Sequence, residues 1–525
     1  MYASTTTAAA NKIFNVTFMV YFCFKFILVI SLGKFRKEYL KHYLYRQNNS
    51  KKMINNFLST QIARKFPHNP TEEQRLAMQT IADFLLSGEA DGLLLLKGYA
   101  GTGKTSLVGA LVRTLTELGR KSVLLAPTGR AAKVFSAYAG HKAFTIHKKI
   151  YRQKAYSNDM GNFLPAENVH KDTIFIVDEA SMIANQTSEG YIFGSGRLLD
   201  DLIHYVYAGE GCRLMLMGDT AQLPPVGQNC SPALERAVLE GYGLQVHEIS
   251  LTQVVRQEHD SGILFNATRL RDALRNQAVE IFPKLRLANF RDFRSISGED
   301  LIEAISSAYD HDGLEETIII TRSNRRATIY NNGIRARILW REEELSSGDR
   351  LMVARNNYFW TAGQKETDFI ANGEIIRLRR IRRTYEMYGF RFADVQAEFQ
   401  EQDTEQEMDL KVLLDTLQND SPALTKEQND RLFYAVLEDY MDVPTKAGKL
   451  RKMKADPHYN ALQVKYAYAI TCHKAQGGQW RNVFLDIGYI TEDMLGEDFY
   501  RWLYTAFTRA TECLYLVNLP SEFIE

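Results

Sequence analysis

Three glycines precede a lysine and a threonine at a spacing that suits the binding of a phosphate group. Gly98, Gly101 and Gly103 lead directly into Lys104 and Thr105, in the pattern G-x-x-x-x-G-K-[ST]. Glycines allow backbone N–H groups to curl around an anion, and a helix N-terminus adds partial positive charge. The lysine would reach the β- and γ-phosphates of a nucleotide, and the threonine hydroxyl would hold Mg²⁺. The sequence therefore predicts a nucleoside triphosphate site, whose loop also contains Thr102 and Ser106.

Two adjacent acids, Asp178 and Glu179, follow the apolar run 173–177. An apolar strand that ends in two acids downstream of a phosphate loop is the Walker B arrangement. In it Asp178 would complete the Mg²⁺ shell and Glu179 would polarise the attacking water. The alternative is an ordinary acidic turn at a strand end. Gln222 follows the apolar run 213–217 and is placed where a side chain could sense the γ-phosphate.

Short apolar runs must form the strands that carry these groups. The runs 93–96, 122–126, 173–177 and 213–217 each predict a buried strand of a parallel sheet. Before the first of them, Thr71 is a predicted helix N-cap, with Gln74 at capping-box spacing. Gln74 has a second interpretation, because a carboxamide can pair with both N6 and N7 of adenine. Its position does not separate the two roles.

Polar and basic residues follow the second strand. Pro127 and Thr128 come at the carboxyl end of 122–126, where open α/β sheets bind ligands. His147 lies in a further polar and basic run, 145–149. Taken singly, loop solvation explains these residues equally well.

Four strings in fixed order, GYAGTGKTS, APTGRAAK, VDEAS and GDTAQLPPVG, resemble motifs I, Ia, II and III of the superfamily 1 helicases. TGRAAK and QLPPVG resemble most closely the RecD-like and Dda-like branch of class B, which is similar to the exodeoxyribonuclease V alpha subunit. Three later strings, LTQVVRQ, YAITCHKAQGG and LYTAFTRA, resemble motifs IV, V and VI of the same family.

This resemblance implies roles for further residues. Arg256 in motif IV and Arg509 in motif VI would reach the γ-phosphate from the far side of the nucleotide cleft. Gln476 and Gly477 of motif V would face the nucleotide. The residues that would meet a DNA strand are Pro127, Thr128, His147, Thr471 and His473.

The resemblance also implies the architecture, an α/β fold with two RecA-like parallel-sheet cores of the P-loop NTPase type. A small insertion that contains a β-barrel would interrupt the second core. We expect a hairpin at about 151–171 to project from the first core, as the best candidate for a wedge that splits the duplex. The predicted divisions are 53–260 for the first core, 261–340 and 456–525 for the second core, and 341–455 for the insertion.

The insertion carries two basic clusters separated by an acidic segment. Residues 394–442 contain fourteen acids and three Lys/Arg, with helical stretches predicted near 410–417 and 432–437. The first cluster would either follow a nucleic-acid backbone or pair with acids of its own chain, and the sequence favours neither. The first cluster consists of Arg377, Arg379, Arg380, Arg382 and Arg383, and the second of Lys446, Lys449, Arg451, Lys452 and Lys454.

The first fifty residues differ from the rest. Residues 13–32 are long and apolar enough to span a bilayer, with Lys25 as their one charge, and Met53 opens a new composition. We favour a non-native leader or extension over 1–52 rather than a membrane anchor, because nothing later requires a membrane. We therefore expect a cytoplasmic protein without a membrane partner. Five scattered cysteines without a CxxC pair fit a reducing compartment and argue against structural zinc.

With 64 Lys and Arg against 63 Asp and Glu, the global charge says nothing about partners. The motifs instead predict a DNA helicase that uses ATP and Mg²⁺, moves 5′→3′ on single-stranded DNA and unwinds tailed duplexes. The polarity comes from the resemblance alone. The alternative is a single-strand translocase, or the motor subunit of a nuclease complex with repair or recombination proteins as partners. A 3′→5′ repair-type helicase would share the motifs, but TGRAAK and QLPPVG argue against it.

Overall fold

The computed structural model describes residues 53–153, 163–186, 194–254, 261–280, 282–357, 359–361, 370–399 and 407–525. The apolar segment 13–32 and Arg256 lie outside these ranges. Within them, no helix combines the length and the apolar character that crossing a bilayer requires.

The first core is a six-stranded parallel sheet in the order β3-β2-β6-β7-β1-β8. The four strands predicted from apolar runs are all present and adjoin one another in it. Its strands are β1 (Gly92–Gly98), β2 (Lys121–Ala126), β3 (Ala143–Thr145), β6 (Thr173–Val177), β7 (Arg213–Gly218) and β8 (Gln245–Leu251). Its helices are α3 (Glu72–Leu86), α4 (Lys104–Glu117), α5 (Gly129–Ala139), α6 (Ile146–Ile150), α7 (Leu198–Tyr207) and α8 (Arg236–Glu240).

Helices cover both faces of this sheet, which explains why its strands are apolar throughout. Leu94 and Leu96 of β1 pack with α3, α4 and α5, whereas Leu93 and Leu95 pack with α6 and α7 on the opposite face. All four leucines are fully buried. Successive side chains of a strand point to opposite faces, so a sheet covered on both faces needs an unbroken apolar run.

The second core is a five-stranded parallel sheet in the order β16-β10-β17-β18-β9. The prediction of two parallel-sheet cores is therefore confirmed. Its strands are β9 (Phe293–Ile296), β10 (Thr317–Thr321), β16 (Ala469–Thr471), β17 (Trp480–Asp486) and β18 (Ala510–Val517). Its helices are α9 (Gly262–Arg275), α10 (Leu301–Asp312), α11 (Asn324–Arg337), α14 (Cys472–Ala475) and α15 (Glu497–Phe507).

A closed barrel interrupts the second core between α11 and β16, as predicted. Its strands are β11 (Arg350–Val353), β12 (Ile375–Met387), β13 (Phe390–Phe399), β14 (Glu407–Leu413) and β15 (Leu462–Tyr466). The last strand lies beyond 455, the expected end of the insertion. β14 and β15 pair in parallel, so the chain must cross over between them, and α12 (Lys426–Glu438) and α13 (Lys446–Lys454) form that crossover.

One predicted helix in the insertion is wrong. The stretch 410–417 contains strand β14 followed by a 3₁₀ turn, Leu414–Thr416. Met408, Leu410 and Val412 are buried along β14, and the strand pairs with β13 over seven residues. The second predicted helix, near 432–437, is confirmed as part of α12.

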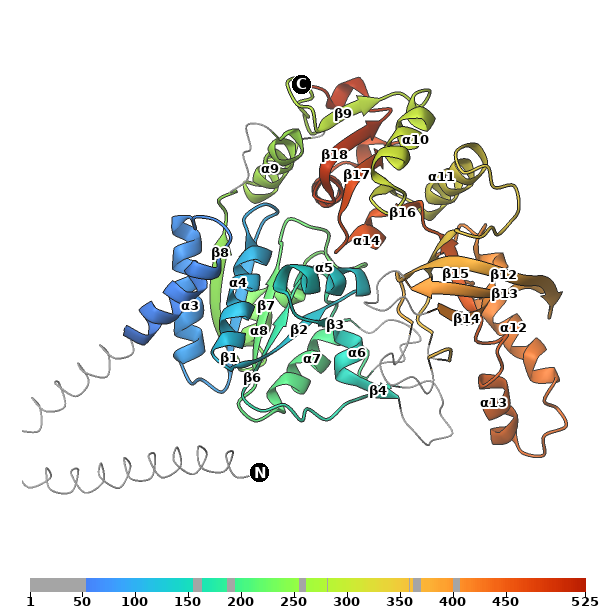
Figure 1. Cartoon of the computed structure of the whole chain (residues 1–525), viewed down its shortest axis with the longest axis horizontal. Helices are drawn as coiled ribbons and strands as arrows, with labels where there is room; N and C mark the ends of the chain where they lie inside the picture. The colour runs from blue at the N-terminus through green and yellow to red at the C-terminus, as the bar shows by residue number, and fades with distance from the viewer. Residues whose placement is uncertain are drawn as a thin grey trace, which may run out of the picture.

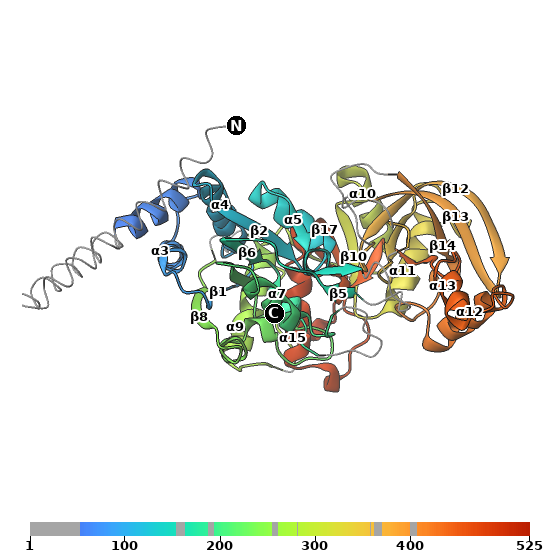
Figure 2. The same ribbon diagram turned by 90° about the horizontal axis from the view of Figure 1, so that it is seen from below.

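The two cores and the barrel lie beside one another (Figure 1). The first core occupies the lower left of that view, the second core lies above it, and the barrel lies to the right of both. Figure 2, seen from below, shows the barrel again beside the two cores. A short hairpin of β4 (Tyr151–Gln153) and β5 (Phe163–Pro165) leaves the first core on the side of the barrel, and residues 154–162 between its strands lie outside the described ranges.

Candidate active site between the two cores

The phosphate loop connects β1 to α4. Gly101 and Gly103 have φ angles of 78° and 84°, a left-handed region that favours glycine. A side chain at Gly98 would come within 2.9 Å of the Lys104 side chain. Lys104 Nζ lies over the loop, where it donates to the carbonyls of Gly98 and Tyr99 at 2.5 and 2.8 Å. Backbone amides, a helix N-terminus and an ammonium group thus converge on one anion site.

Gln74 lies under this loop, where both the oxygen and the nitrogen of its amide form a hydrogen bond. Its Oε1 accepts from the Thr71 N–H at 3.0 Å, and its Nε2 donates to the Thr102 carbonyl at 2.9 Å. The capping box predicted with Thr71 is therefore confirmed. A side chain at Gly103 would meet Gln74 Nε2 at 2.7 Å, so Gln74 supports the glycine turn from below. Adenine recognition by this residue stays a prediction.

Asp178 and Glu179 stand at the carboxyl end of β6. Asp178 accepts the Glu179 N–H at 2.7 Å, and Glu179 adopts a left-handed conformation with φ of 52°. Burial and the adjacent charge of Glu179 raise the pKa of Asp178 to about 7, while the charges of Lys104 and Arg509 act in the opposite direction. The two adjacent carboxyl groups thus carry more negative charge than Lys104 and Arg509 neutralise, and such an excess favours the binding of a cation.

The residues present fit a nucleoside triphosphate with Mg²⁺. Thr105 in the first turn of α4 and Asp178 supply the hydroxyl and the carboxylate that such a metal takes, with phosphate and water oxygens as its other ligands. Gln222 is 5% exposed, and its Oε1 has no hydrogen-bond partner within the described residues. A buried acceptor without a donor fits a position that faces a bound water, which can donate to it. Ser106 lies half-buried in the same turn of α4.

Arg509 reaches this site from the second core. Its Nη1 lies 3.8 Å from Glu179 Oε1, and only 3% of the residue is exposed. The guanidinium is held by the carbonyls of Thr505 and Gly478, at 3.0 and 3.3 Å, and by the Thr508 hydroxyl at 3.1 Å. A buried, fixed guanidinium opposite the acids of the other core has the placement of an arginine finger. Arg256, the other predicted arginine, lies outside the described residues.

Tyr504 of α15 also crosses the cleft, although no separate role was predicted for it. Its hydroxyl accepts the Ala100 N–H of the phosphate loop at 2.9 Å and donates to Asp219 Oδ2 at 2.6 Å. Burial, reinforced by the Asp219 charge, raises the pKa of Tyr504 well above its usual value, so the hydroxyl stays protonated. One signal was available, because Asp219 directly follows buried strand β7, just as Asp178 follows β6.

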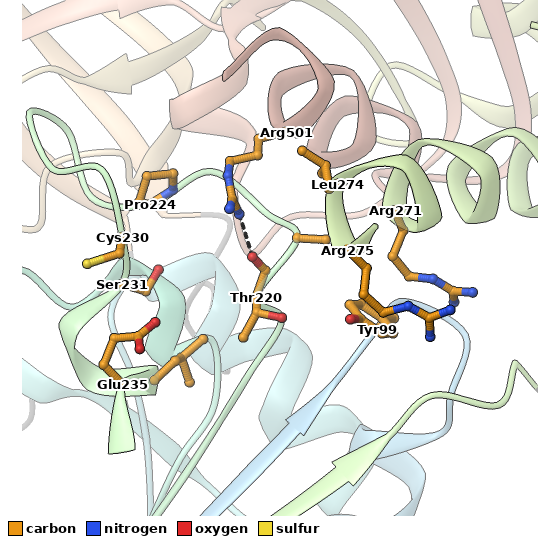
Figure 3. Close-up of a pocket in the computed structure, with 12 residues that line it drawn as sticks. Tyr99, Thr220, Pro224, Cys230, Ser231, Glu235, Arg271, Leu274, Arg275 and Arg501 are labelled. Carbon is orange, nitrogen blue, oxygen red and sulfur yellow. Dashed lines mark hydrogen bonds between the residues drawn. The ribbon is translucent and has the colours of Figure 1, made fainter. Parts of the chain in front are cut away.

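Other hydrogen bonds tie the same segment of the first core to the second core. The Leu223 N–H donates to Thr505 Oγ1 at 2.9 Å, and Gln476 Nε2 donates to the Leu223 carbonyl at 2.8 Å. Arg501 Nη1 donates to the Thr220 carbonyl at 2.5 Å, across a pocket of about 250 Å³ that both cores line (Figure 3). Gln476, predicted to face the nucleotide, therefore binds the loop after β7.

Replacing Tyr504 with phenylalanine should lower kcat/KM for ATP by roughly tenfold. The Ala100 N–H and the Asp219 carboxylate each lose a hydrogen-bond partner, at a total cost in free energy of about 1–2 kcal/mol. Steady-state hydrolysis with saturating single-stranded DNA measures this. Tyr500→Phe is the matched control, since among the described residues that hydroxyl bonds with the backbone of Glu280, within its own core. Equal losses in the two variants would assign the effect to helix α15 rather than to the contact across the cleft.

A cavity of about 600 Å³ lies where the two cores and the barrel meet. Thr128 and Arg130 line it from the first core, His473 and Lys474 from the second, and Met352 and Ile375 from the barrel. Of the five predicted DNA-binding residues, Thr128 and His473 meet here. Burial lowers the pKa of Lys474 to about 8. We refer to this cavity as the inter-core groove.

The backbones of the two cores approach closely beside this groove. A side chain at Gly477 would lie 2.7 Å from Ala131 Cβ, so the glycine is required by the contact. The Arg130 guanidinium stacks on the Trp480 ring at 3.8 Å and donates to the Gln479 carbonyl at 3.2 Å. Trp480 is 1% exposed and packs between the two cores at the edge of the groove.

The other predicted DNA-binding residues do not line the groove. Thr471 ends β16 just before His473 on α14, and Pro127 precedes Thr128, the N-cap of α5. His147 packs against Tyr151 at a ring distance of 5.7 Å, and burial lowers its pKa to about 4, so it is neutral near pH 7. DNA contact by Pro127, His147 and Thr471 stays a prediction.

Two family models match this chain, one in each core. The model described as an AAA domain matches residues 70–284, and that described as a UvrD-like helicase C-terminal domain matches residues 466–517.

Among curated proteins, the mimivirus protein R530 of Acanthamoeba polyphaga mimivirus is 22% identical over 84% of this chain and 98% of its own length. The ATP-dependent RecD2 DNA helicase of Deinococcus radiodurans is 28% identical over 43% of this chain and 29% of its own length. The ATP-dependent DNA helicase Dda of Enterobacteria phage T4 is 24% identical over 54% of this chain. The chain spans 62% of Dda and under a third of RecD2.

Among solved structures, a Pif1 helicase from Bacteroides in complex with ADP-AlF3 and single-stranded DNA matches with a TM-score of 0.43. It is 16% identical, over 87% of this chain and 94% of the other. The ordered motifs, the two matching models and the curated relatives agree: this chain is similar to the RecD2 and Dda helicases, and its motifs resemble those of the superfamily 1 helicases.

Proposed function

We propose that this protein is an ATP-dependent DNA helicase that moves 5′→3′ along single-stranded DNA and unwinds tailed duplexes. The observation that carries the proposal is Arg509 of the second core, which reaches Glu179 of the first core beside the phosphate loop. Hydrolysis is thereby linked to the relative position of the two cores. The direction of movement rests on the family resemblance.

In this proposal each residue of the site has a separate role in hydrolysis. Lys104 and the loop amides would hold the phosphates, and Thr105 and Asp178 would hold Mg²⁺, which would supply neutralisation of the phosphate charge. Glu179 takes the proton of the attacking water, Gln222 orients that water, and Arg509 stabilises the charge on the transferring phosphoryl group.

The same closure acts on the inter-core groove. Gly477 and Trp480 of the second core contact Ala131 and Arg130 of the first, at one edge of the cavity that Thr128 and His473 line. Opening the nucleotide cleft must shift these contacts, because both sites lie between the same two bodies. Two arrangements of the cores that differ in affinity for a single strand convert hydrolysis into movement.

The test is strand separation on two duplexes, one with a 5′ overhang and one with a 3′ overhang, in the presence of ATP and Mg²⁺. We expect unwinding of the 5′-tailed duplex only, and no unwinding by Lys104→Ala, which removes the ammonium from the phosphate site. Unwinding of the 3′-tailed duplex alone would contradict the polarity. DNA-stimulated hydrolysis without separation would favour the alternative of a translocase that needs a partner protein. A cytoplasmic location stays a prediction.

A further inference from the structure

The two basic clusters of the insertion differ in how their charges are satisfied. The first lies on β12, where Arg379, Arg382 and Arg383 bind acids of the neighbouring strands. Arg379 Nη2 lies 2.5 Å from Glu398, Arg382 Nη2 lies 2.6 Å from Asp409, and Arg383 Nε lies 2.6 Å from Asp394. The internal pairing considered for this strand is thus confirmed for three of its five arginines.

The second cluster is helix α13, and its cations have no such partners. Among the residues that the structure describes, none of its five basic side chains forms an ion pair. Lys449 Nζ contacts the thioether of Met441 at 3.7 Å, which offsets no charge. Two acids that flank the helix in sequence are engaged elsewhere, since Asp439 accepts from the Tyr388 hydroxyl and Asp456 from the Tyr440 hydroxyl.

The helix is fixed to the barrel by its apolar face. Met453 is fully buried and Leu450 packs beside it, in a cluster with Phe390 and Phe392 of β13. Arg451 and Lys452, which lie between these two anchors, are exposed. A helix whose one face is anchored must present its charges on the other, so the cations are held together at a fixed surface.

This surface lies away from the inter-core groove. β12 starts at the groove with Ile375 and runs for 13 residues, and α13 packs against the part of the barrel near its far end. At about 3.3 Å per residue that strand extends roughly 40 Å, about one turn of a DNA duplex. Figures 1 and 2 place α13 and the β4–β5 hairpin on the same side of the molecule.

We propose that α13 binds the phosphate backbone of the duplex arm of a tailed DNA, about one helical turn from the strand in the groove. The proposal rests on the proposed function, which supplies DNA as the polyanion. Lysine and arginine that neutralise phosphates release counterions, and each such contact adds about 0.9 to the salt dependence of binding to a duplex. The duplex is favoured over a single strand because of the distance from the groove.

The test variant replaces three cations of α13, Lys449→Gln, Arg451→Gln and Lys452→Gln. Glutamine has a helix propensity close to that of lysine and arginine, so the helix is retained. If two of the three contact phosphates, the slope of log K against log[salt] for a tailed duplex falls by about 2, and binding at about 0.15 M salt weakens roughly 30-fold. Fluorescence anisotropy over a salt series measures both values.

The matched control carries the same charge change on β12, Arg379→Gln, Arg382→Gln and Arg383→Gln. Its arginines already bind acids of the chain, so we expect a wild-type slope. A wild-type slope for the α13 variant, or equal losses in both variants, would overturn the proposal. An equal loss on single-stranded DNA without a duplex would also overturn it. ATP hydrolysis stimulated by single-stranded DNA, which lacks the duplex arm that α13 would bind, reports on the proposed function separately.

Discussion

Arg509→Ala is expected to lower kcat for DNA-stimulated ATP hydrolysis by about a thousandfold or more, the usual contribution of an arginine finger. The guanidinium is fixed by three hydrogen bonds within its own core and faces Glu179 across the cleft. Among the described residues of the first core, Glu179 alone forms an ion pair with Arg509, so removal of the guanidinium should leave the phosphate loop intact. Nucleotide affinity should therefore change far less than kcat.

Single-turnover hydrolysis together with binding of a fluorescent nucleotide separates these two effects. Arg509→Lys is the second variant to compare. Lysine retains the positive charge but lacks the planar guanidinium that donates to Thr505, Gly478 and Thr508. We expect it to stay closer to the alanine variant than to the wild type. A kcat within tenfold of the wild type for Arg509→Ala would mean that Arg509 only packs against Glu179.

Asp349→Ala is expected to destabilise the second core and its barrel by about 3–5 kcal/mol, as when one partner of a buried ion pair is removed. Asp349 is fully buried and accepts from Arg335 at 3.0 and 3.1 Å, from Arg341 at 2.6 Å and from the Tyr468 hydroxyl at 3.0 Å. Without the carboxylate, two guanidinium groups remain in the interior without a counterion.

Thermal unfolding followed by circular dichroism should show a decrease in Tm on the order of 10 °C for this variant. Asp409→Ala provides the control, since Asp409 forms an exposed pair with Arg382 at 2.6 Å. Exposed pairs contribute about 0–1 kcal/mol, so the control should unfold close to the wild-type temperature. Similar Tm values for the two variants would show that the Asp349 network adds nothing beyond a surface contact.

Local sequence predicted the cores well because both the strands and their motifs are local features. The run Leu93–Leu96 is buried on both faces of a sheet, and only a continuous apolar run can satisfy that position. The acids after β6 and the glycines before α4 follow from the same rule, since ligand groups gather where parallel strands end. Lys104, Asp178 and Glu179 are therefore brought together by the fold as expected.

The failures concern features that depend on distant parts of the chain. Leu410, Leu413, Leu414 and Leu417 recur with a helical period, whereas Met408, Leu410 and Val412 alternate as in a strand. Hydrogen bonding to β13 stabilises the strand over the helix, and that pairing cannot be predicted from the sequence of this segment alone. In the same way, Tyr504 and Asp219 lie 285 residues apart in sequence, and only the folded structure shows that the Tyr504 hydroxyl donates a hydrogen bond to Asp219.

The direct connection between β15 and β16 couples the position of the barrel to that of the second core. β15 ends at Tyr466 and β16 begins at Ala469, with Tyr468 between them bound to Asp349. The barrel must then turn with the second core as one body. At a radius of roughly 40 Å, each degree of rotation moves the end of β12 by about 0.7 Å. A turn of about 5° thus displaces α13 by about 3.5 Å, close to the spacing of about 3.4 Å between nucleotides along one strand of a duplex. A small angular change at the nucleotide would become, at α13, a displacement as long as one base step.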